Sequence, residues 1–174
     1  MNVTTYDNAL LITREDIDRE CRPCSTQDAL ADRCIEEAQM LDIKPAVGDA
    51  VFLRLFDPAD EAAQTLWYGG KYTDSCGNAR IFSGLRKALL YYAYGRIVRA
   101  SGGVATRFDY VVKADQYSDS ADGKAKSQAY NEAFSIADGY KEQALLFMAE
   151  HPSDFGNERR KIINNRLQLK KIGY

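Results

Sequence analysis

The sequence predicts a mainly α-helical fold: a small helical bundle with a short β-hairpin or extended loop insertion and an extended C-terminal tail. Three observations support this prediction. Apolar side chains recur at helical spacing in several segments, and a glycine-centred segment between two of them is rich in β-type residues. The last residues, 153–174, are polar and basic and have no strong apolar stripe.

Length and composition are typical of one globular domain. The chain has 174 residues, 45% of them hydrophobic and 28% charged, and a chain of this size buries about 70% of its unfolded surface. Its start has no basic region followed by an apolar one, as a secretory signal would, and no apolar run approaches the ~20 residues that cross a membrane. We expect a protein made in a cytoplasm, with an N-terminal arm (1–24), a helical domain (25–152) and a tail (153–174).

The first segments of the chain predict two helices. Thr13 is placed to start a short helix that Pro23 ends, and Ser25 resembles the first residue of a capping box for a helix over about residues 26–41. We expect Pro45 to stop this second helix. Its apolar face is formed by Leu30, Cys34, Ile35, Ala38 and Leu41.

Two more helices are expected next. The apolar run 47–56 fits a strand or a buried helix, and the spacing of its apolar residues favours the helix. Asp57-Pro58 is typical of a helix start, with Asp as N-cap and Pro in the first turn. Gly69-Gly70 would end this helix over residues 58–68.

The middle of the chain predicts a small hairpin or irregular loop and then a long helix. Residues 71–82 have β-type side chains on both sides of Gly77-Asn78. Ser83 is placed to cap the long helix, which Gly102-Gly103 ends. Apolar residues cover more than half of its circumference, which predicts neighbours on two sides. They are Leu85, Ala88, Leu89, Tyr92, Ala93, Ile97 and Val98.

A long loop and a second long helix follow. Residues 104–122 contain aromatic side chains but no helical period, and a loop of this length that keeps aromatics is usually functional. From about residue 121 an apolar stripe predicts a helix that ends before His151-Pro152. The stripe consists of Tyr130, Ala133, Phe134, Ala137, Tyr140, Ala144, Leu145 and Met148.

The sequence lacks the motifs of common catalytic and metal sites. The one histidine, His151, has no Gly-x-Ser-x-Gly elbow to accompany it. Cys21 and Cys24 form a Cys-x-x-Cys pair, but a zinc ribbon needs a second pair and a thioredoxin-like site needs a preceding βαβ strand. We therefore expect reduced thiols, no enzymatic activity, no metal and no cofactor.

Charge is distributed unevenly along the chain. Residues 1–62 contain fourteen Asp and Glu against six Lys and Arg, whereas residues 156–174 contain six Lys and Arg against one Glu. This asymmetry favours a charged partner for the tail, or head-to-tail contacts between copies. The adjacent carboxylates Glu15-Asp16 and Glu36-Glu37 are expected on solvated helix faces.

Three tyrosines, Tyr91, Tyr92 and Tyr94, lie among basic residues and admit two interpretations. Single-stranded nucleic acid would stack on exposed rings of this kind. Helical spacing instead puts Tyr92 on the apolar stripe and the other two on its flanks, where such rings fill helix and subunit contacts. We prefer packing.

Several segments together resemble the head-to-tail connector (adaptor) proteins of tailed bacteriophages. They are Ile43-Lys-Pro-Ala-Val-Gly-Asp-Ala-Val-Phe52, Tyr68-Gly-Gly-Lys-Tyr72 and Gly84-Leu-Arg-Lys-Ala-Leu-Leu-Tyr-Tyr-Ala-Tyr-Gly-Arg96, followed by an extended stretch and a final long helix. The resemblance covers roughly residues 25–150, and the Cys-rich start departs from the family's plainest pattern.

This resemblance implies a non-enzymatic virion protein. Such adaptors form a homo-oligomeric ring, usually of twelve copies, beneath the capsid portal at the junction with the tail. The ring extends the channel for DNA, without sequence-specific contact, and gives the next tail or neck protein an attachment surface.

The resemblance also implies roles for two groups of residues. The tail from Glu158 to Tyr174 would dock on the portal through Arg159, Arg160, Lys161, Ile163, Arg166, Leu167, Lys170, Lys171 and Tyr174. The loop over residues 107–117 would contact the neighbouring subunit. The predicted subunit-contact residues are Tyr91, Tyr94, Phe108, Tyr110 and Tyr117.

Two other functions compete with this one. The basic tail would also suit a helical protein that binds nucleic acid nonspecifically and in a salt-sensitive way, although its interspersed Ile and Leu residues favour a groove on a protein. An enzyme or redox protein would have to use Cys21 and Cys24.

Overall fold

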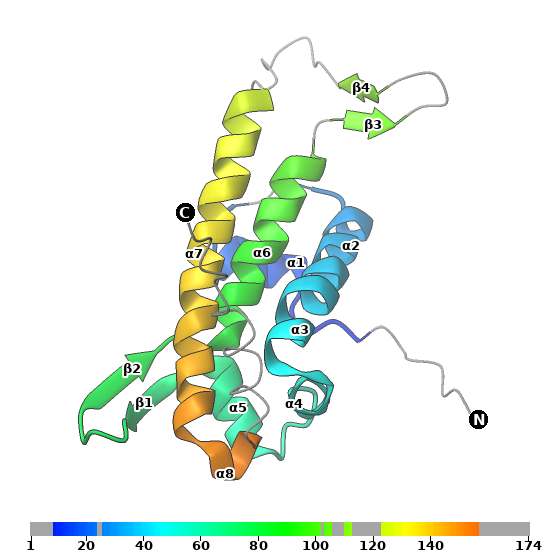
Figure 1. Cartoon of the computed structure of the whole chain (residues 1–174). Helices are drawn as coiled ribbons and strands as arrows, with labels where there is room; N and C mark the ends of the chain where they lie inside the picture. Colours follow the sequence, from blue (N-terminus) through cyan, green and yellow to red (C-terminus); the bar gives the residue numbers. More distant parts are fainter. Residues whose placement is uncertain (1–8, 24–25, 102, 106–109, 113–122, 157–174) are drawn as a thin grey trace, which may run out of the picture.

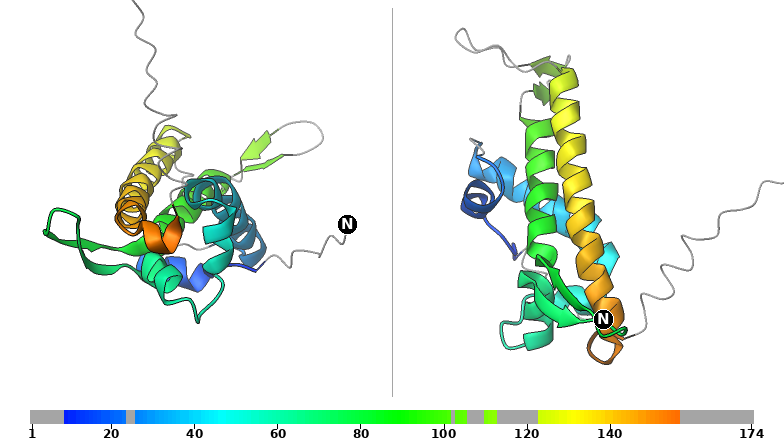
Figure 2. Two further views of the ribbon diagram at one scale, coloured as in Figure 1. Left: turned by 60° about the horizontal axis from the view of Figure 1, so that its bottom comes forward. Right: turned by 90° about the vertical axis from the view of Figure 1, so that its left-hand side faces the viewer.

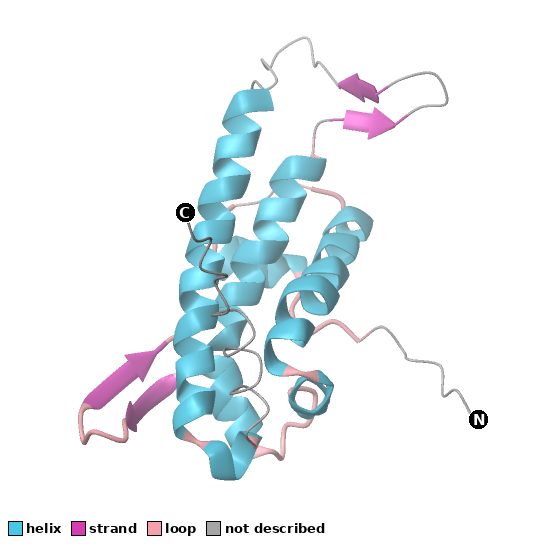
Figure 3. Ribbon diagram, viewed as in Figure 1, coloured by secondary structure: helices cyan, strands magenta, loops and turns pink. Residues whose placement is uncertain are grey.

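The computed structural model describes residues 9–23, 26–101, 103–105, 110–112 and 123–156. Within these ranges the chain is mainly helical, as predicted, with two short antiparallel strand pairs (Figures 1 and 3). In order, its elements are α1 (Arg14–Glu20), α2 (Asp28–Ala38), the π-helix η1 (Gln39–Ile43), α3 (Lys44–Val47), α4 (Asp49–Arg54), α5 (Glu61–Tyr68), β1 (Gly70–Thr73), β2 (Ala79–Phe82), α6 (Gly84–Ala100), β3 (Gly103–Ala105), β4 (Tyr110–Val112), α7 (Gly123–Glu150) and α8 (Pro152–Phe155).

Helix α6 is the centre of the bundle. It packs along α7 and also contacts α1, α2, η1 and α5, which confirms the prediction of neighbours on more than one side. Gly95 lies against the ring of Phe134 from α7; a Cβ at this position would be 3.0 Å from a ring carbon. The buried residues of α6 are Gly84, Leu85, Ala88, Leu89, Leu90, Tyr92, Ala93, Gly95 and Ile97.

Helix α7 meets α6 mainly through small side chains. Ala133, Ala137 and Ala144 are buried, and they allow the two long helices to approach closely. Larger side chains are buried near its end, where Phe147 and Met148 join the core. The sequence predicts an apolar stripe along this segment, and α7 lies where that prediction puts the helix.

Helix α1 begins where the sequence predicts. Thr13 accepts a hydrogen bond from the backbone N–H of Asp16, and the Asp16 side chain accepts from the backbone N–H of Thr13, which completes a capping box. Ile12 and Ile17 are buried in the same core as α6. The described part of the N-terminal segment therefore packs into the helical domain.

The prediction that Pro45 stops the second helix is wrong. Helix α2 begins at Asp28 with Gln27 as N-cap, and the backbone continues through η1 into α3. Pro45 lies in the first turn of α3, directly after the wider π turn, and the helical path continues past it. The wider π turn leaves Leu41, a predicted core residue, 62% exposed.

The next two helices are shorter than predicted. Gly48 has a φ of 84° and separates α3 from α4, so the predicted helix over 47–56 is divided. Helix α5 begins three residues late because Asp60, not Asp57, is its N-cap, with a carboxylate oxygen 3.0 Å from Ala63 N. Asp57 instead accepts from Ala59 N in the preceding turn.

The predicted hairpin is confirmed as β1 and β2, which pair antiparallel with Lys71 opposite Ile81. It projects from the bundle beside α7 (Figure 1). Its base is formed by Gly69 and Gly84, both with positive φ. The backbone segments around Gly69 and Gly84 cross closely here. A Cβ on Gly84 would lie 2.2 Å from the carbonyl oxygen of Trp67, so no larger residue fits at this crossing.

A second strand pair lies at the opposite end of α6 (Figure 1). Strand β3 pairs antiparallel with β4, with Val104 opposite Val111. The sequence predicts only an unpaired extended stretch here, and it places Gly103 at the helix end, whereas Ser101 is the C-cap and Gly103 begins β3. At the other end of α7, helix α8 buries Phe155, which the sequence assigns to the tail.

Candidate functional site

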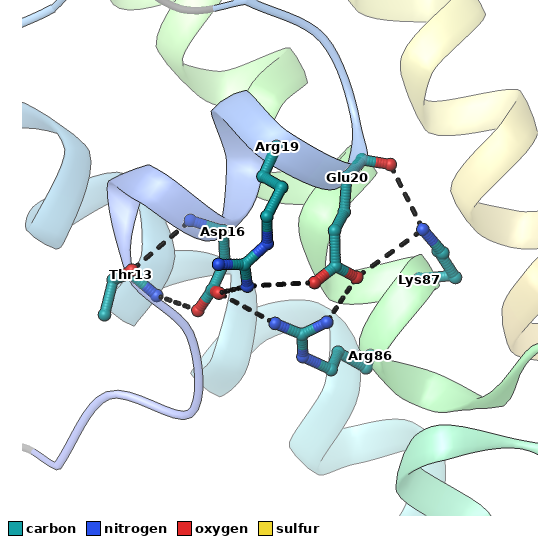
Figure 4. Close-up of polar contacts among 6 residues, drawn as sticks. All are labelled: Thr13, Asp16, Arg19, Glu20, Arg86 and Lys87. Carbon is teal, nitrogen blue, oxygen red and sulfur yellow. Dashed lines mark hydrogen bonds and ion pairs between the residues drawn. The ribbon is translucent and has the colours of Figure 1, made fainter.

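Arg86 of α6 joins α1 to the bundle through a cluster of charged side chains (Figure 4). Its guanidinium lies 2.9 Å from an Asp16 carboxylate oxygen and also donates to the carboxylate of Glu20. Lys87 Nζ donates to the backbone oxygen of Glu20 at 3.1 Å, and Arg19 pairs with Asp16 at 2.6 Å. The side chain of Asp16 is only 18% exposed, so its predicted position on a solvated face is wrong.

The electrostatics of this cluster are those of a structural contact. The hydrogen bond from Arg86 is the main reason that the pKa of Glu20 is lowered to about 2. Glu20 therefore stays ionised at neutral pH, and a permanently ionised carboxylate paired with Arg is poorly suited to proton transfer. The cluster holds α1 against α6.

Tyr92 is the centre of a second polar contact, between α6 and α7. Its hydroxyl donates to Asp138, and Lys141 Nζ lies 2.5 Å from both the Tyr92 hydroxyl and Asp138 Oδ1. Burial is the largest cause of a raised pKa for Tyr92, which keeps the phenol protonated. Tyr92 is 1% exposed with its ring edge-on to Phe134, so it packs between helices and is not a base-stacking surface.

A third contact ties η1 to α6. Arg96 donates to Asp42 at 2.6 Å and lies over the ring of Phe134, 5.4 Å from its centroid. Burial raises the pKa of Asp42, while the bond from Arg96 opposes this shift. The pair fixes the π turn against the central helix.

Two of the predicted subunit-contact residues pack within the chain. Tyr91 lies 5.9 Å from the ring of Tyr140, and the guanidinium of Arg22 lies 5.9 Å from the ring centroid of Tyr94. Both tyrosines keep part of their surface exposed. Their role in contacts between copies stays a prediction.

The other predicted site residues are not brought together by the described structure. Tyr110 begins strand β4, away from the hairpin, whereas Phe108 and Tyr117 lie outside the described residues. The portal-docking residues of the tail also lie outside them: Arg159, Arg160, Lys161, Ile163, Arg166, Leu167, Lys170, Lys171 and Tyr174. Cys24 is outside as well, so the Cys-x-x-Cys pair stays untested.

The hairpin and α7 enclose the surface hollow that best fits a functional site. Its volume is about 270 Å³. Tyr72 anchors the hairpin edge-on to Phe147, and Glu150 accepts a hydrogen bond from Ser75 N at 2.8 Å. Ile81 and Leu146, both highly exposed, contribute apolar surface. The lining residues are Tyr72, Asp74, Arg80, Ile81, Phe82, Gln143, Leu146 and Glu150.

Asp74 and Arg80 form an ion pair within this hollow. Asp74 accepts from Asn78 N at 2.8 Å and from Arg80 Nε at 2.8 Å, and these bonds lower its pKa to about 2. A hollow whose carboxylates already accept hydrogen bonds and which carries two exposed aliphatic side chains suits contact with another protein surface.

Sequence reasoning missed this site because it treated the hairpin only as a connection. One signal was present. Alternation along the two strands places Ile81 beside Lys71, on the face opposite Tyr72 and Phe82, so an apolar residue on the outer face could be identified once the pairing was assumed.

The Cys, His, Asp and Glu side chains of the described residues form no group of three or more that could hold a metal ion. Of the described helices, none combines the length and apolar character needed to cross a bilayer.

Comparison with known proteins relates the chain to a family. A family model described as "Family of unknown function (DUF6712)" matches residues 43–161. No curated protein and no solved structure matches the chain. The matched region includes both strands of the hairpin and helices α6 and α7.

Proposed function

Because the chain belongs to the DUF6712 family, whose function is unknown, we propose a function from its own residues: a structural, non-enzymatic protein of tailed bacteriophage virions. In this proposal it forms a ring between the capsid portal and the tail. The ring, of about twelve copies if it follows the symmetry usual for such adaptors, extends the DNA channel. The protein is made in the host cytoplasm and acts at the capsid–tail junction.

The observation that carries the proposal is the projecting hairpin with its exposed Ile81. A rigid bundle that presents a large aliphatic side chain on a projecting element has a surface suited to another protein. Leu146 extends this apolar surface across the hollow onto α7. The resemblance of the hairpin and α6 sequences to phage adaptors supplies the class of partner.

The proposed contacts divide between the parts of the chain. The bundle forms the ring wall, and the hollow beside α7 receives the next tail or neck protein. The basic segment 158–174 docks on the portal. DNA passes through the ring without sequence-specific contact.

The decisive experiment mixes the purified protein with portal rings of the same phage. Negative-stain images should show additional density at one end of the portal. Native mass spectrometry should give a number of bound copies that is compatible with the rotational symmetry of the portal ring. A variant that lacks residues 158–174 tests the role of the tail. It should fail to bind the portal while keeping the circular dichroism spectrum of a helical bundle. A full-length protein that stays monomeric and never associates with portal rings would contradict the proposal.

The second candidate is a helical protein that binds nucleic acid through its tail. It is favoured by the six Lys and Arg against one Glu in residues 156–174. A salt titration against double-stranded DNA separates the two, because nonspecific binding weakens steeply with salt. Tight, salt-dependent binding that is lost on deletion of residues 158–174, in a protein that ignores the portal, would favour this candidate.

A further inference from the structure

We propose that copies of this protein contact one another head to tail, with the outer face of the hairpin of one copy docked on the η1–α4 face of the next. The outer face of the hairpin is defined by Lys71 and Ile81. The η1–α4 face is defined by Leu41 and Leu53 with the carboxylates Glu37 and Asp49. The inference rests on the proposed ring and identifies the two surfaces that would join it.

The register of the hairpin determines which side chains face outward. Tyr72 and Phe82 contact each other edge-on, and both contact Phe147 of α7. Successive residues of a strand point to opposite faces, so Lys71 and Ile81, which are opposite each other, lie on the outer face. Ile81 is 73% exposed, the largest value among the big apolar side chains of the described residues.

The second surface combines exposed leucines with a small excess of carboxylates. Leu41 is 62% and Leu53 58% exposed. Leu53 follows Asp49 by four residues within α4, and residues at that spacing are neighbours on an α-helix surface. Leu41 lies in the π turn that follows Glu37 and the end of α2. The side chain of Glu37 is 55% exposed and lies 3.7 Å from Arg96, and that of Asp49 is 80% exposed and lies 3.7 Å from Lys44. Because Arg96 also pairs with Asp42, this surface keeps one more carboxylate than cations.

The two surfaces are therefore complementary. An isoleucine beside a lysine on the hairpin would meet leucines beside carboxylates on η1–α4. The aliphatic side chains would lose water together, while Lys71 would approach Glu37 and Asp49. Charge complementarity of this kind selects the partner surface and the orientation of docking.

The arrangement of the elements requires two copies. The hairpin projects on the side of α7, whereas η1, α3 and α4 lie on the other side of α6 in both Figure 1 and Figure 2. One copy cannot bring these two faces together. A contact between two different faces is heterologous, so it repeats from copy to copy and gives a ring when the rotation between copies closes.

This assignment uses one residue of the hollow between β1–β2 and α7. Ile81 lines that hollow together with Gln143 and Leu146 of α7. The ring contact and the attachment of a tail or neck protein would therefore share Ile81, while the α7 side of the hollow stays available.

The first experiment identifies the partner surface directly. The variant Ile81→p-benzoylphenylalanine is irradiated as a mixture of ¹⁵N-labelled and unlabelled full-length protein, both concentrated alone and bound to portal rings. Mass spectrometry should find mixed-isotope products joined to the peptide that contains Leu53 or the one that contains Leu41. Joining to another hairpin, joining elsewhere, or no product between copies in either preparation would overturn the assignment.

The second experiment tests the charge match. Lys71→Glu should weaken association between copies by about tenfold or more, since like charges would face each other. The double variant Lys71→Glu with Asp49→Lys should recover most of this loss. Lys124→Glu is the matched control, because it makes the same change on an exposed lysine at the far end of α7 and should have little effect.

Association is measured by analytical ultracentrifugation, and thermal melts of each variant monitor folding. Loss of association without recovery in the double variant would contradict the pairing of Lys71 with Asp49. The proposed function fails separately: copies that cross-link as expected but ignore the portal keep the contact and refute the adaptor role. Copies that bind the portal but cross-link elsewhere keep the adaptor role and refute the contact.

Discussion

The α6–α7 interface and the β1–β2 hairpin are held in opposite ways. The interface buries Tyr92 and Ala137 almost completely, and α6 also buries Leu89 in the surrounding core. The hairpin keeps most of its residues exposed and is attached by its base, by the ring of Tyr72 and by the bond from Ser75 N to Glu150. Two strands alone are marginally stable in water, so the hairpin depends on the bundle for its position.

This difference separates stability from recognition. Side chains in the interface contribute to the free energy of unfolding because they are removed from water. The outer hairpin side chains contribute little to folding and are available to a partner. Changes in the two regions should therefore affect different measurements.

The largest contrast is expected between Leu89→Ala and Ile81→Ala. Leu89 is fully buried, so its truncation should lower the free energy of unfolding by about 2–5 kcal/mol. Ile81→Ala should change it by less than about 0.5 kcal/mol. Urea denaturation measures both; similar losses would show that the hairpin is part of the cooperative core.

The base of the hairpin should be the next most sensitive position. Gly84→Ala combines a positive φ, which costs about 1–3 kcal/mol, with a Cβ that would overlap the Trp67 carbonyl. Gly77→Ala at the hairpin tip also has a positive φ, but its Cβ would meet no described atom within 4 Å. Chemical denaturation should therefore show a clearly larger loss for Gly84→Ala, and equal losses would contradict the close crossing at the base.

A smaller effect is expected from Tyr92→Phe. Removal of the hydroxyl leaves Asp138 and Lys141 without their shared partner, and this should cost about 1–3 kcal/mol. Tyr68→Phe is the control, because Tyr68 is exposed at the end of α5. Thermal melts of the two variants should differ, and a Tyr92→Phe protein as stable as the wild type would show that the hydroxyl is dispensable.

The smallest effect concerns pH and the α1–α6 cluster. The pKa of Glu20 is lowered from 4.5 to about 2 in the folded protein, so its ionised form stabilises the fold above the unfolded pKa. This contribution should be lost as the pH falls from 4.5 toward 2. Glu20→Gln should cost about 1 kcal/mol at neutral pH and reduce the acid dependence of unfolding in that window.

The control for this prediction is Glu142→Gln, which changes an exposed carboxylate of α7. Its denaturation profile between pH 2 and 5 should follow the wild type. An unchanged profile for Glu20→Gln would show that Arg86 does not stabilise the ionised carboxylate.

Most of the helices and the hairpin could be predicted because their signals are local. The apolar stripes of α6 and α7 follow the helical period, and Gly77-Asn78 occupies the turn of the hairpin. Some helix boundaries were predicted wrongly because two nearby residues are equally good helix caps. Asp57 and Asp60 are both good N-caps, and the chain uses the second, whose carboxylate also pairs with Arg54.

The candidate site could be predicted only in part. The sequence identified Tyr92 as a packing residue, and its position in the core is confirmed. The assembly role that the sequence suggested stays a prediction. It gave no reason to expect a hollow beside α7. Leu41 was assigned to the core because an α-helical period was assumed across a segment that forms a π turn.

The amino-acid sequence alone determined the helical class, the order of the main elements and the location of the hairpin, because periodicity, capping residues and glycine turns act over a few neighbouring residues. Tertiary structure decided the rest. The pairing of Glu20 with Arg86 joins residues 66 apart, and the crossing of Gly69 and Gly84 depends on backbone packing. The exposure of Ile81 on an outer face, which supports the proposed contact between copies, likewise depends on how the hairpin lies against α7.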